Sequence, residues 1–120
     1  MDKYIYCIKE DYTISEVMEA IDRSNTRCVI VLNKMDKVVG VVSQGDVLRA
    51  LISGANLYSH VSNIMNRSFI YLRKRDSEEA AKLMLQRRIS LLPVLDEDYH
   101  LLDVVTVNDT YEYLAGKNND

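Results

Sequence analysis

Apolar positions recur at two different spacings along this chain. Over residues 14–24 and 80–85 they lie three or four positions apart, which is the spacing of an amphipathic helix. Short continuous apolar runs follow these segments in pairs, at residues 28–32, 38–42, 91–95 and 101–105. Such runs, joined in each pair by a polar turn, predict hairpins of buried β-strands.

Capping residues mark where these two helices begin. Thr13 with Glu16, and Asp76 with Glu79, have the spacing of a helix N-cap and the third helical residue. The apolar positions of both helices are expected to face the core, and they are Ile14, Val17, Met18, Ile21, Ala80, Leu83, Met84 and Leu85.

Two closing helices are predicted after the hairpins. They cover residues 46–53 and 108–115, and a glycine that can end a helix follows each of them, Gly54 and Gly116.

The chain contains the same unit twice. Residues 40–46 reappear as 103–109, at the shift of 63 residues that separates Ser43 from Thr106. The register continues without a gap through further pairs, which include Glu16 and Glu79, Val31 and Val94, and Leu51 and Leu114. Because the match covers a whole unit, it indicates a duplication and not a chance motif.

Each unit has the order strand, helix, strand, strand, helix, with its first strand at residues 6–8 or 69–71. A unit of this size is too small to bury a good core alone. We therefore predict an α/β (α+β) fold in which two repeats, related by a pseudo-twofold axis, pack sheet to sheet. The predicted division is a first repeat at 1–55, a linker at 56–66, a second repeat at 67–116 and a polar tail at 117–120.

Composition narrows the functional classes. The chain has 120 residues, of which 48% are hydrophobic, so it is long enough for one compact domain. Fifteen basic and eighteen acidic residues give a net charge of −3, which argues against nucleic acid as a partner. No apolar run approaches the ~20 residues that span a bilayer, and the N-terminus lacks the features of a secretory signal. A soluble, cytoplasmic protein without a membrane partner is expected.

Patterns typical of catalysis or metal binding are missing from the sequence. Cys7 and Cys28 do not form a CxxC pair, and His60 and His100 lie 40 residues apart, outside any short metal-ligand spacing. The four glycines form neither GxGxxG nor GxxxxGKS/T, and there is no GxSxG. We expect neither an enzyme nor a metal or prosthetic group in this chain.

The duplicated motif places a hydroxyl and a carboxylate together at the end of a buried strand. Ser43 and Asp46 form the first of these strand-to-helix corners, and Thr106 and Asp109 form the second. Two interpretations remain open. The residues can be ordinary helix caps, or they can bind a ligand, because helix N-termini attract anions and an aspartate can accept two hydrogen bonds from a ribose diol.

The chain resembles a tandem pair of CBS (cystathionine-β-synthase) domains, the Bateman module. The resemblance rests on the order of elements in both halves, on the segment 92–96 before the second turn, and on the two motifs at 40–46 and 103–109. It implies a cleft between the halves that holds AMP, ADP or ATP, with the motif aspartate on the ribose and the hydroxyl near the phosphate.

Carried over by position, the resemblance implies two ligand sites. The first would use Ser43 and Asp46, together with Arg27, Cys28, Asn63, Ser68, Ile89, Ser90 and Leu91. The second would use Thr106 and Asp109, with Ser90 and Leu91 beside them. The first half would add Thr26, Arg27 and the approach strand near Ile5 to this second site.

The first of these sites is favoured. The residue matching Asn63 would precede Met1, so the second site lacks the segment that corresponds to the linker beside the first site. Asp103 also stands where the first repeat has Gly40, and its charge should disfavour a polyphosphate near the second site. Arg27 is the basic side chain placed to meet a phosphate in the first site, and the alternative is a solvated residue at the end of a helix-to-strand loop. Arg67 and the cluster 73–75 are expected to be solvated surface, although Arg67 is close enough in sequence to Ser68 to reach a phosphate.

Residues 63–70 and 102–105 resemble the N-terminal CBS pairs that precede sugar-phosphate nucleotidyltransferase domains. This resemblance implies a non-catalytic regulatory module that controls an attached or partner nucleotidyltransferase and forms a homodimer. The alternative is a structural module that dimerises and binds no ligand.

Overall fold

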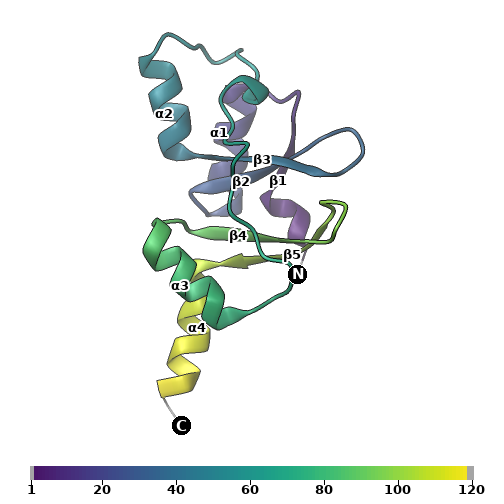
Figure 1. The fold of residues 1–120 in the computed structure, drawn as a ribbon. Coiled ribbons are helices and arrows are strands. Elements are labelled where there is room, and N and C mark those ends of the chain that lie inside the picture. Colours follow the sequence, from purple (N-terminus) through teal and green to yellow (C-terminus); the bar gives the residue numbers. More distant parts are fainter. Residues whose placement is uncertain (1, 119–120) are drawn as a thin grey trace.

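The computed structural model describes residues 2–118 and contains two similar halves stacked on one another (Figure 1). The first half comprises η1 (Lys3–Tyr6), β1 (Cys7–Lys9), α1 (Ile14–Ser24), β2 (Cys28–Leu32), β3 (Val38–Ser43) and α2 (Gln44–Ile52). The turn η2 (Val61–Asn63) follows, and the second half comprises α3 (Ser77–Arg87), β4 (Leu91–Leu95), β5 (Leu101–Thr106) and α4 (Val107–Asn118). The predicted α+β fold of two related repeats is confirmed.

The two sheets differ by one strand. The first has the order β1-β2-β3, with β1 parallel and β3 antiparallel to β2, whereas the described part of the second contains only the antiparallel pair β4-β5. The strand predicted at 69–71 is therefore wrong, and the following Leu72 forms a single parallel bridge with Val94. Phe69 and Tyr71 instead pack their rings together, and Tyr71 packs on Tyr99 of the β4-β5 turn.

The continuous apolar runs are explained by burial on both faces of each sheet. In β2, Val29 and Val31 belong to the core beneath α1, while Ile30 and Leu32 belong to a core shared with Leu91 and other residues of the second repeat. Successive residues of a strand point to opposite faces, so both faces need apolar side chains. The predicted sheet-to-sheet packing is confirmed.

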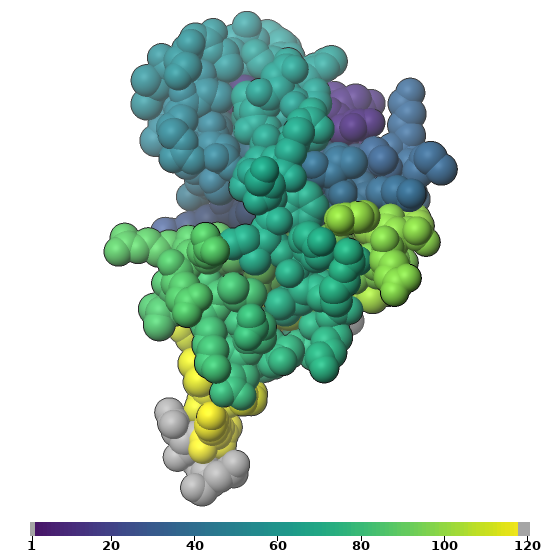
Figure 2. All heavy atoms as spheres, in the orientation of Figure 1, coloured from purple at the N-terminus to yellow at the C-terminus, as the bar shows by residue number. Residues whose placement is uncertain are grey.

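The linker follows one face of the molecule and crosses from the first repeat to the second (Figure 2). Val61 and Met65 are buried in the core of the first repeat. The backbone of Asn66 pairs with β3, because Val41 N–H donates to Asn66 O at 3.0 Å and Asn66 N–H donates to Val41 O at 2.8 Å. The linker is therefore a packed strap along the edge of β3.

Three details of the predicted helices are wrong. Met18 and Leu85 are 45% and 83% exposed, although both were expected in the core. Each directly follows a core residue, Val17 or Met84, and the spacing of apolar positions does not decide which of two neighbours faces inward. Helix α4 also continues through Gly116, since glycine permits a helix to end without forcing it to do so. Every helix within residues 2–118 is too short or too polar to cross a membrane.

Candidate functional site

The first strand-to-helix corner forms a complete helix cap. Ser43 ends β3 and caps α2: its Oγ accepts from the N–H of Asp46 at 3.1 Å, and Asp46 Oδ2 accepts from the N–H of Ser43 at 2.9 Å. Asp46 Oδ1 accepts from the Arg49 guanidinium at 2.8 Å, but the Arg49 side chain is 72% exposed. The cap interpretation is confirmed, and it uses one carboxylate oxygen of Asp46.

The same corner faces a cleft of about 750 Å³ between the repeats. Eight of the residues predicted for the first site line it, namely Arg27, Cys28, Ser43, Asp46, Ser68, Ile89, Ser90 and Leu91. Asn63 lies instead in η2, and Asn66 forms the corresponding part of the cleft wall. The hydroxyl and carboxylate of the first corner therefore lie on the boundary between the halves, where the resemblance to a CBS pair implies them.

Two basic residues of the cleft were missed by the sequence analysis. Arg87 and Arg88 line the cleft together with Arg27. Arg88 ends α3 in the left-handed conformation, with φ 54°, and Asn25, the matching residue of the first repeat, does the same at φ 56°. This turn directs the chain into the cleft just before Ile89. The signal available in the sequence was the position of both arginines directly before residues 89–91.

The charges that line the cleft are predominantly positive. Arg27, Arg87 and Arg88 have no ion-pair partner within residues 2–118, and Asp46 is the acidic residue of the lining. Arginine binds phosphate and carboxylate oxygens through its fork of N–H donors. The cleft can therefore hold an anion next to a hydrogen-bond acceptor.

Cys28 contributes an uncharged wall to the cleft. Burial raises the pKa of its thiol to about 12, and the nearby Asp46 carboxylate adds to this effect. The Sγ atom lies 3.8 Å from the carbonyl oxygen of Val29, to which it donates. A thiol held in the neutral form is a poor nucleophile, so Cys28 acts here as a packing residue.

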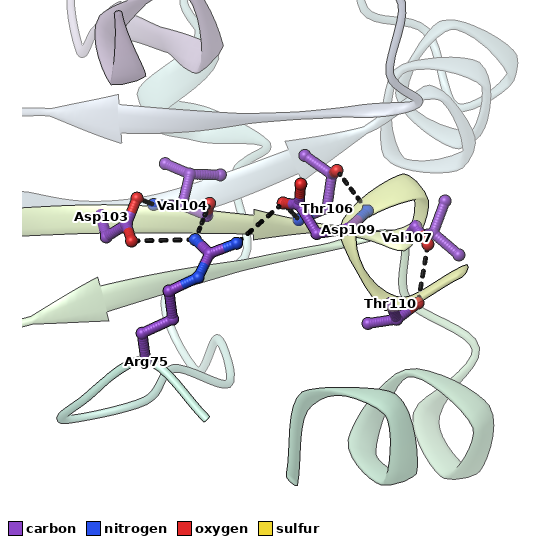
Figure 3. Close-up of polar contacts among 7 residues, drawn as sticks. All are labelled: Arg75, Asp103, Val104, Thr106, Val107, Asp109 and Thr110. Carbon is purple, nitrogen blue, oxygen red and sulfur yellow. Dashed lines mark hydrogen bonds and ion pairs between the residues drawn. The ribbon is translucent and has the colours of Figure 1, made fainter. Parts of the chain in front are cut away.

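The second corner has the same cap and a different neighbour. Thr106 N–H donates to Asp109 Oδ2 at 2.8 Å, and Asp109 N–H donates to Thr106 Oγ1 at 3.4 Å. Arg75, which lies just before α3, reaches both Asp103 Oδ2, at 2.8 Å, and Asp109 Oδ2, at 3.5 Å (Figure 3). Asp103 therefore stands beside the second corner, as expected, and Arg75 pairs with its carboxylate.

Residues 73–75 are exposed, as expected for solvated surface. Arg73 and Arg75 also make contacts that the sequence did not predict. The Arg73 guanidinium lies over the rings of Tyr71 and Tyr99, at 5.0 and 5.2 Å from the ring centroids.

Comparison with known proteins identifies the family of both repeats. Residues 1–53 and 61–116 each match the model of the CBS domain. The magnesium transporter MgtE of Thermus thermophilus is 31% identical over 116 residues, which are 92% of this chain and 25% of the transporter. Arabinose 5-phosphate isomerase GutQ of Salmonella typhi is 29% identical over 101 residues, or 83% of this chain and 32% of the isomerase. The chain thus spans about a quarter to a third of these relatives.

Solved structures give the same result. The cytosolic domain of the Mg²⁺ channel MgtE in complex with ATP has a TM-score of 0.74 at 28% identity, over 94% of this chain and 46% of that one. A CBS domain protein of Pyrobaculum aerophilum complexed with AMP has a TM-score of 0.74 at 23% identity, over 92% and 90%. A CBS domain pair in complex with 5′-methylthioadenosine and S-adenosyl-L-methionine has a TM-score of 0.76 at 21% identity, over 92% and 88%. With two matching stretches, one in each repeat, the chain belongs to the CBS domain family and is a tandem CBS pair.

Proposed function

We propose that this CBS pair is a non-catalytic regulatory module that binds AMP, ADP or ATP in the cleft between its repeats. The observation that carries the proposal is the presence in one cleft of Asp46 and three arginines, Arg27, Arg87 and Arg88, that have no ion-pair partner among residues 2–118. An aspartate can accept from both hydroxyls of a ribose, and arginines bind phosphate oxygens. A ligand with both groups would use both parts of the lining.

The relatives support the same class of ligand. The MgtE cytosolic domain, which is 28% identical to this chain, was solved with ATP, and two other CBS structures of the same fold hold AMP or S-adenosylmethionine. The arginines of this cleft favour a phosphorylated ligand over the cationic sulfonium of S-adenosylmethionine, because like charges repel. A cytoplasmic location, where adenine nucleotides are abundant, is part of the proposal.

Isothermal titration with AMP, ATP and S-adenosylmethionine tests the ligand class. Saturable binding of AMP or ATP, stronger than that of S-adenosylmethionine and weakened by salt, is the expected result. Preference for S-adenosylmethionine would refute the phosphate assignment. Absence of binding with all three ligands would refute nucleotide sensing and favour the structural alternative below.

The proposal also names the enzyme that this module regulates. We assign it as an attached sugar-phosphate nucleotidyltransferase, on the resemblance of residues 63–70 and 102–105 to the CBS pairs that precede such domains. The relatives carry CBS sequences within a transporter and an isomerase, so family membership alone does not select the enzyme. The reading frame downstream of codon 120 tests this assignment: a nucleotidyltransferase domain supports it, and a different catalytic or transport domain refutes it.

A second candidate function is dimerisation with another copy of this chain. Met18 of α1 and Leu48 of α2 line one groove on the outside of the first repeat and are 45% and 60% exposed, and Ile52 is 77% exposed. Apolar side chains gathered in this way are typical of interaction surfaces. In sedimentation equilibrium, the wild type should form a dimer and Leu48→Glu a monomer. A wild-type monomer at 100 times the concentration used for ligand titration would refute this function.

A further inference from the structure

The two repeats close the outer edge of their sheets in different ways. Val41 and Val104 occupy the same position in the duplicated unit, at the shift of 63 residues. At Val41, the backbone of Asn66 supplies both hydrogen bonds, with N···O distances of 3.0 and 2.8 Å. Lys3 is the residue that matches Asn66 for the second repeat, and it lies in the turn η1.

Side chains take the place of the strap at Val104. The N–H of Val104 donates to Asp103 Oδ1 at 2.8 Å, and the Arg75 guanidinium donates to the carbonyl oxygen of Val104 at 3.3 Å (Figure 3). The carboxylate and the guanidinium are themselves joined at 2.8 Å. Together they satisfy the N–H and the carbonyl oxygen of Val104, as the backbone of Asn66 satisfies those of Val41 in the first repeat.

This difference explains why the duplication has Gly40 in one repeat and Asp103 in the other. A Cβ at Gly40 would lie 2.9 Å from the side chain of Met65 and 3.1 Å from the carbonyl oxygen of Asn66. The Met65 side chain and the strap backbone would both have to shift, so the close approach of the strap favours glycine at this position. In the second repeat, the Asp103 carboxylate itself accepts from the Val104 N–H and closes the edge. A glycine at this position could not form that hydrogen bond.

The Arg75–Asp103 pair at Val104 also reaches the second corner. Arg75 Nη2 lies 3.5 Å from Asp109 Oδ2, so the guanidinium contacts two carboxylates and one carbonyl oxygen. In the first corner, the ion-pair partner of Asp46 within the described part of the chain is the exposed Arg49, whose contact lies within one turn of α2. An arginine with several acceptors is harder to displace than one with a single exposed partner.

Positive charge prevails at the first corner, and negative charge prevails at the second. Three arginines and one aspartate line the first cleft. The contacts at the second corner unite one arginine, Arg75, with the carboxylates of Asp103 and Asp109. A phosphate would meet attraction at the first corner and net repulsion at the second.

We propose that Arg75 and Asp103 form a plug that closes the second corner to nucleotides, so that each chain binds one nucleotide, at the Asp46 corner. The stoichiometry rests on the proposed function of the first cleft, whereas the closure of the β5 edge does not. Arg75 thereby determines which of two corners with the same cap binds the nucleotide.

Titration with AMP measures the number of ligands per chain. The test variant is Arg75→Met/Asp103→Gly, which removes the guanidinium and restores the glycine of the first repeat. Lys74→Met is the matched control, because it removes an adjacent exposed cation. We expect one AMP per chain for the wild type and the control, and two for the double variant. Two per chain in the wild type, or one in the double variant, would overturn the proposal.

Amide hydrogen exchange without nucleotide tests the plug separately. The Val104 amide should exchange about ten-fold faster in the double variant than in the wild type, because the loss of its acceptor opens the edge. The Val41 amide, held by Asn66, should be unchanged and reports that the fold is intact. Equal protection of Val104 in both proteins overturns the proposal. If the wild type binds no AMP, the proposed function fails and this measurement alone decides whether the edge is plugged.

Discussion

Replacing Asp46 by alanine separates its role as a cap from its role toward a ligand. The substitution removes the acceptor of the Ser43 N–H, at 2.9 Å, and loss of this capping hydrogen bond costs about 1 kcal/mol of stability. It also removes the ion pair with Arg49, which is 72% exposed and therefore contributes at most about 0.5 kcal/mol. The free energy of unfolding should fall by about 1–1.5 kcal/mol.

The effect on ligand affinity should be larger. If the carboxylate accepts from two ribose hydroxyls, its loss costs about 2–3 kcal/mol of binding, or about 30- to 150-fold in the dissociation constant. Isothermal titration with AMP measures the affinity, and urea denaturation measures the stability of the same samples.

Asp109→Ala is the matched control for this experiment. It removes an equivalent cap, in which Asp109 accepts from the Thr106 N–H at 2.8 Å. The two variants should lose similar stability, but Asp109→Ala should change AMP affinity by less than about three-fold, because the second corner is closed by Arg75. An equal loss of affinity in both variants would refute the asymmetry between the corners.

Three further predictions follow from single side chains. Arg88→Ala should weaken AMP about ten-fold and adenosine less than two-fold, since a guanidinium in the cleft would contact the phosphate; parallel titrations check this, and equal losses contradict it. Ile30→Ala should lower the free energy of unfolding by about 2–5 kcal/mol in urea, because Ile30 is fully buried between the sheets; a loss below about 1 kcal/mol contradicts that core. The pKa of Cys28 is raised from 9.0 to about 12, so the stability from its neutral thiol is complete below pH 9 and is lost as the pH rises toward 12. The stability of the wild type minus that of Cys28→Ser should therefore fall by about 1–2 kcal/mol between pH 7 and pH 10.5; no change contradicts the raised pKa.

The fold was predictable because each element occurs twice, once in each repeat, so the two sequence patterns can be compared. The cap of α1 at Thr13 and Glu16 forms both of its expected hydrogen bonds, and Asp76 caps α3 at the matching position. Each assignment in one repeat supported the same assignment in the other. The prediction was wrong for residues 69–71, where aromatic packing against Tyr99 replaces strand pairing. Periodicity carries no information about such a contact between distant residues.

The position of the first corner was also predictable, whereas its charges were not. The motif predicts that Ser43 and Asp46 end a strand and begin a helix, and the resemblance to a CBS pair implies their place at the boundary of the halves. Arg87 and Arg88 enter the cleft because the chain turns through a left-handed residue at Arg88. Glycine or asparagine usually signals that conformation, and arginine at this position gives no such signal.

Connectivity explains why a duplicated unit should have two unequal corners. A single linker joins the repeats, and its backbone at Asn66 closes the edge of β3 beside the first corner. One segment cannot also close the matching edge at Val104, so the second repeat needs another device. The carboxylate and guanidinium that supply it, Asp103 and Arg75, place charge next to Asp109. The same geometry that stabilises the second edge therefore removes the second corner from ligand binding, and the asymmetry in stoichiometry follows from the topology of the chain.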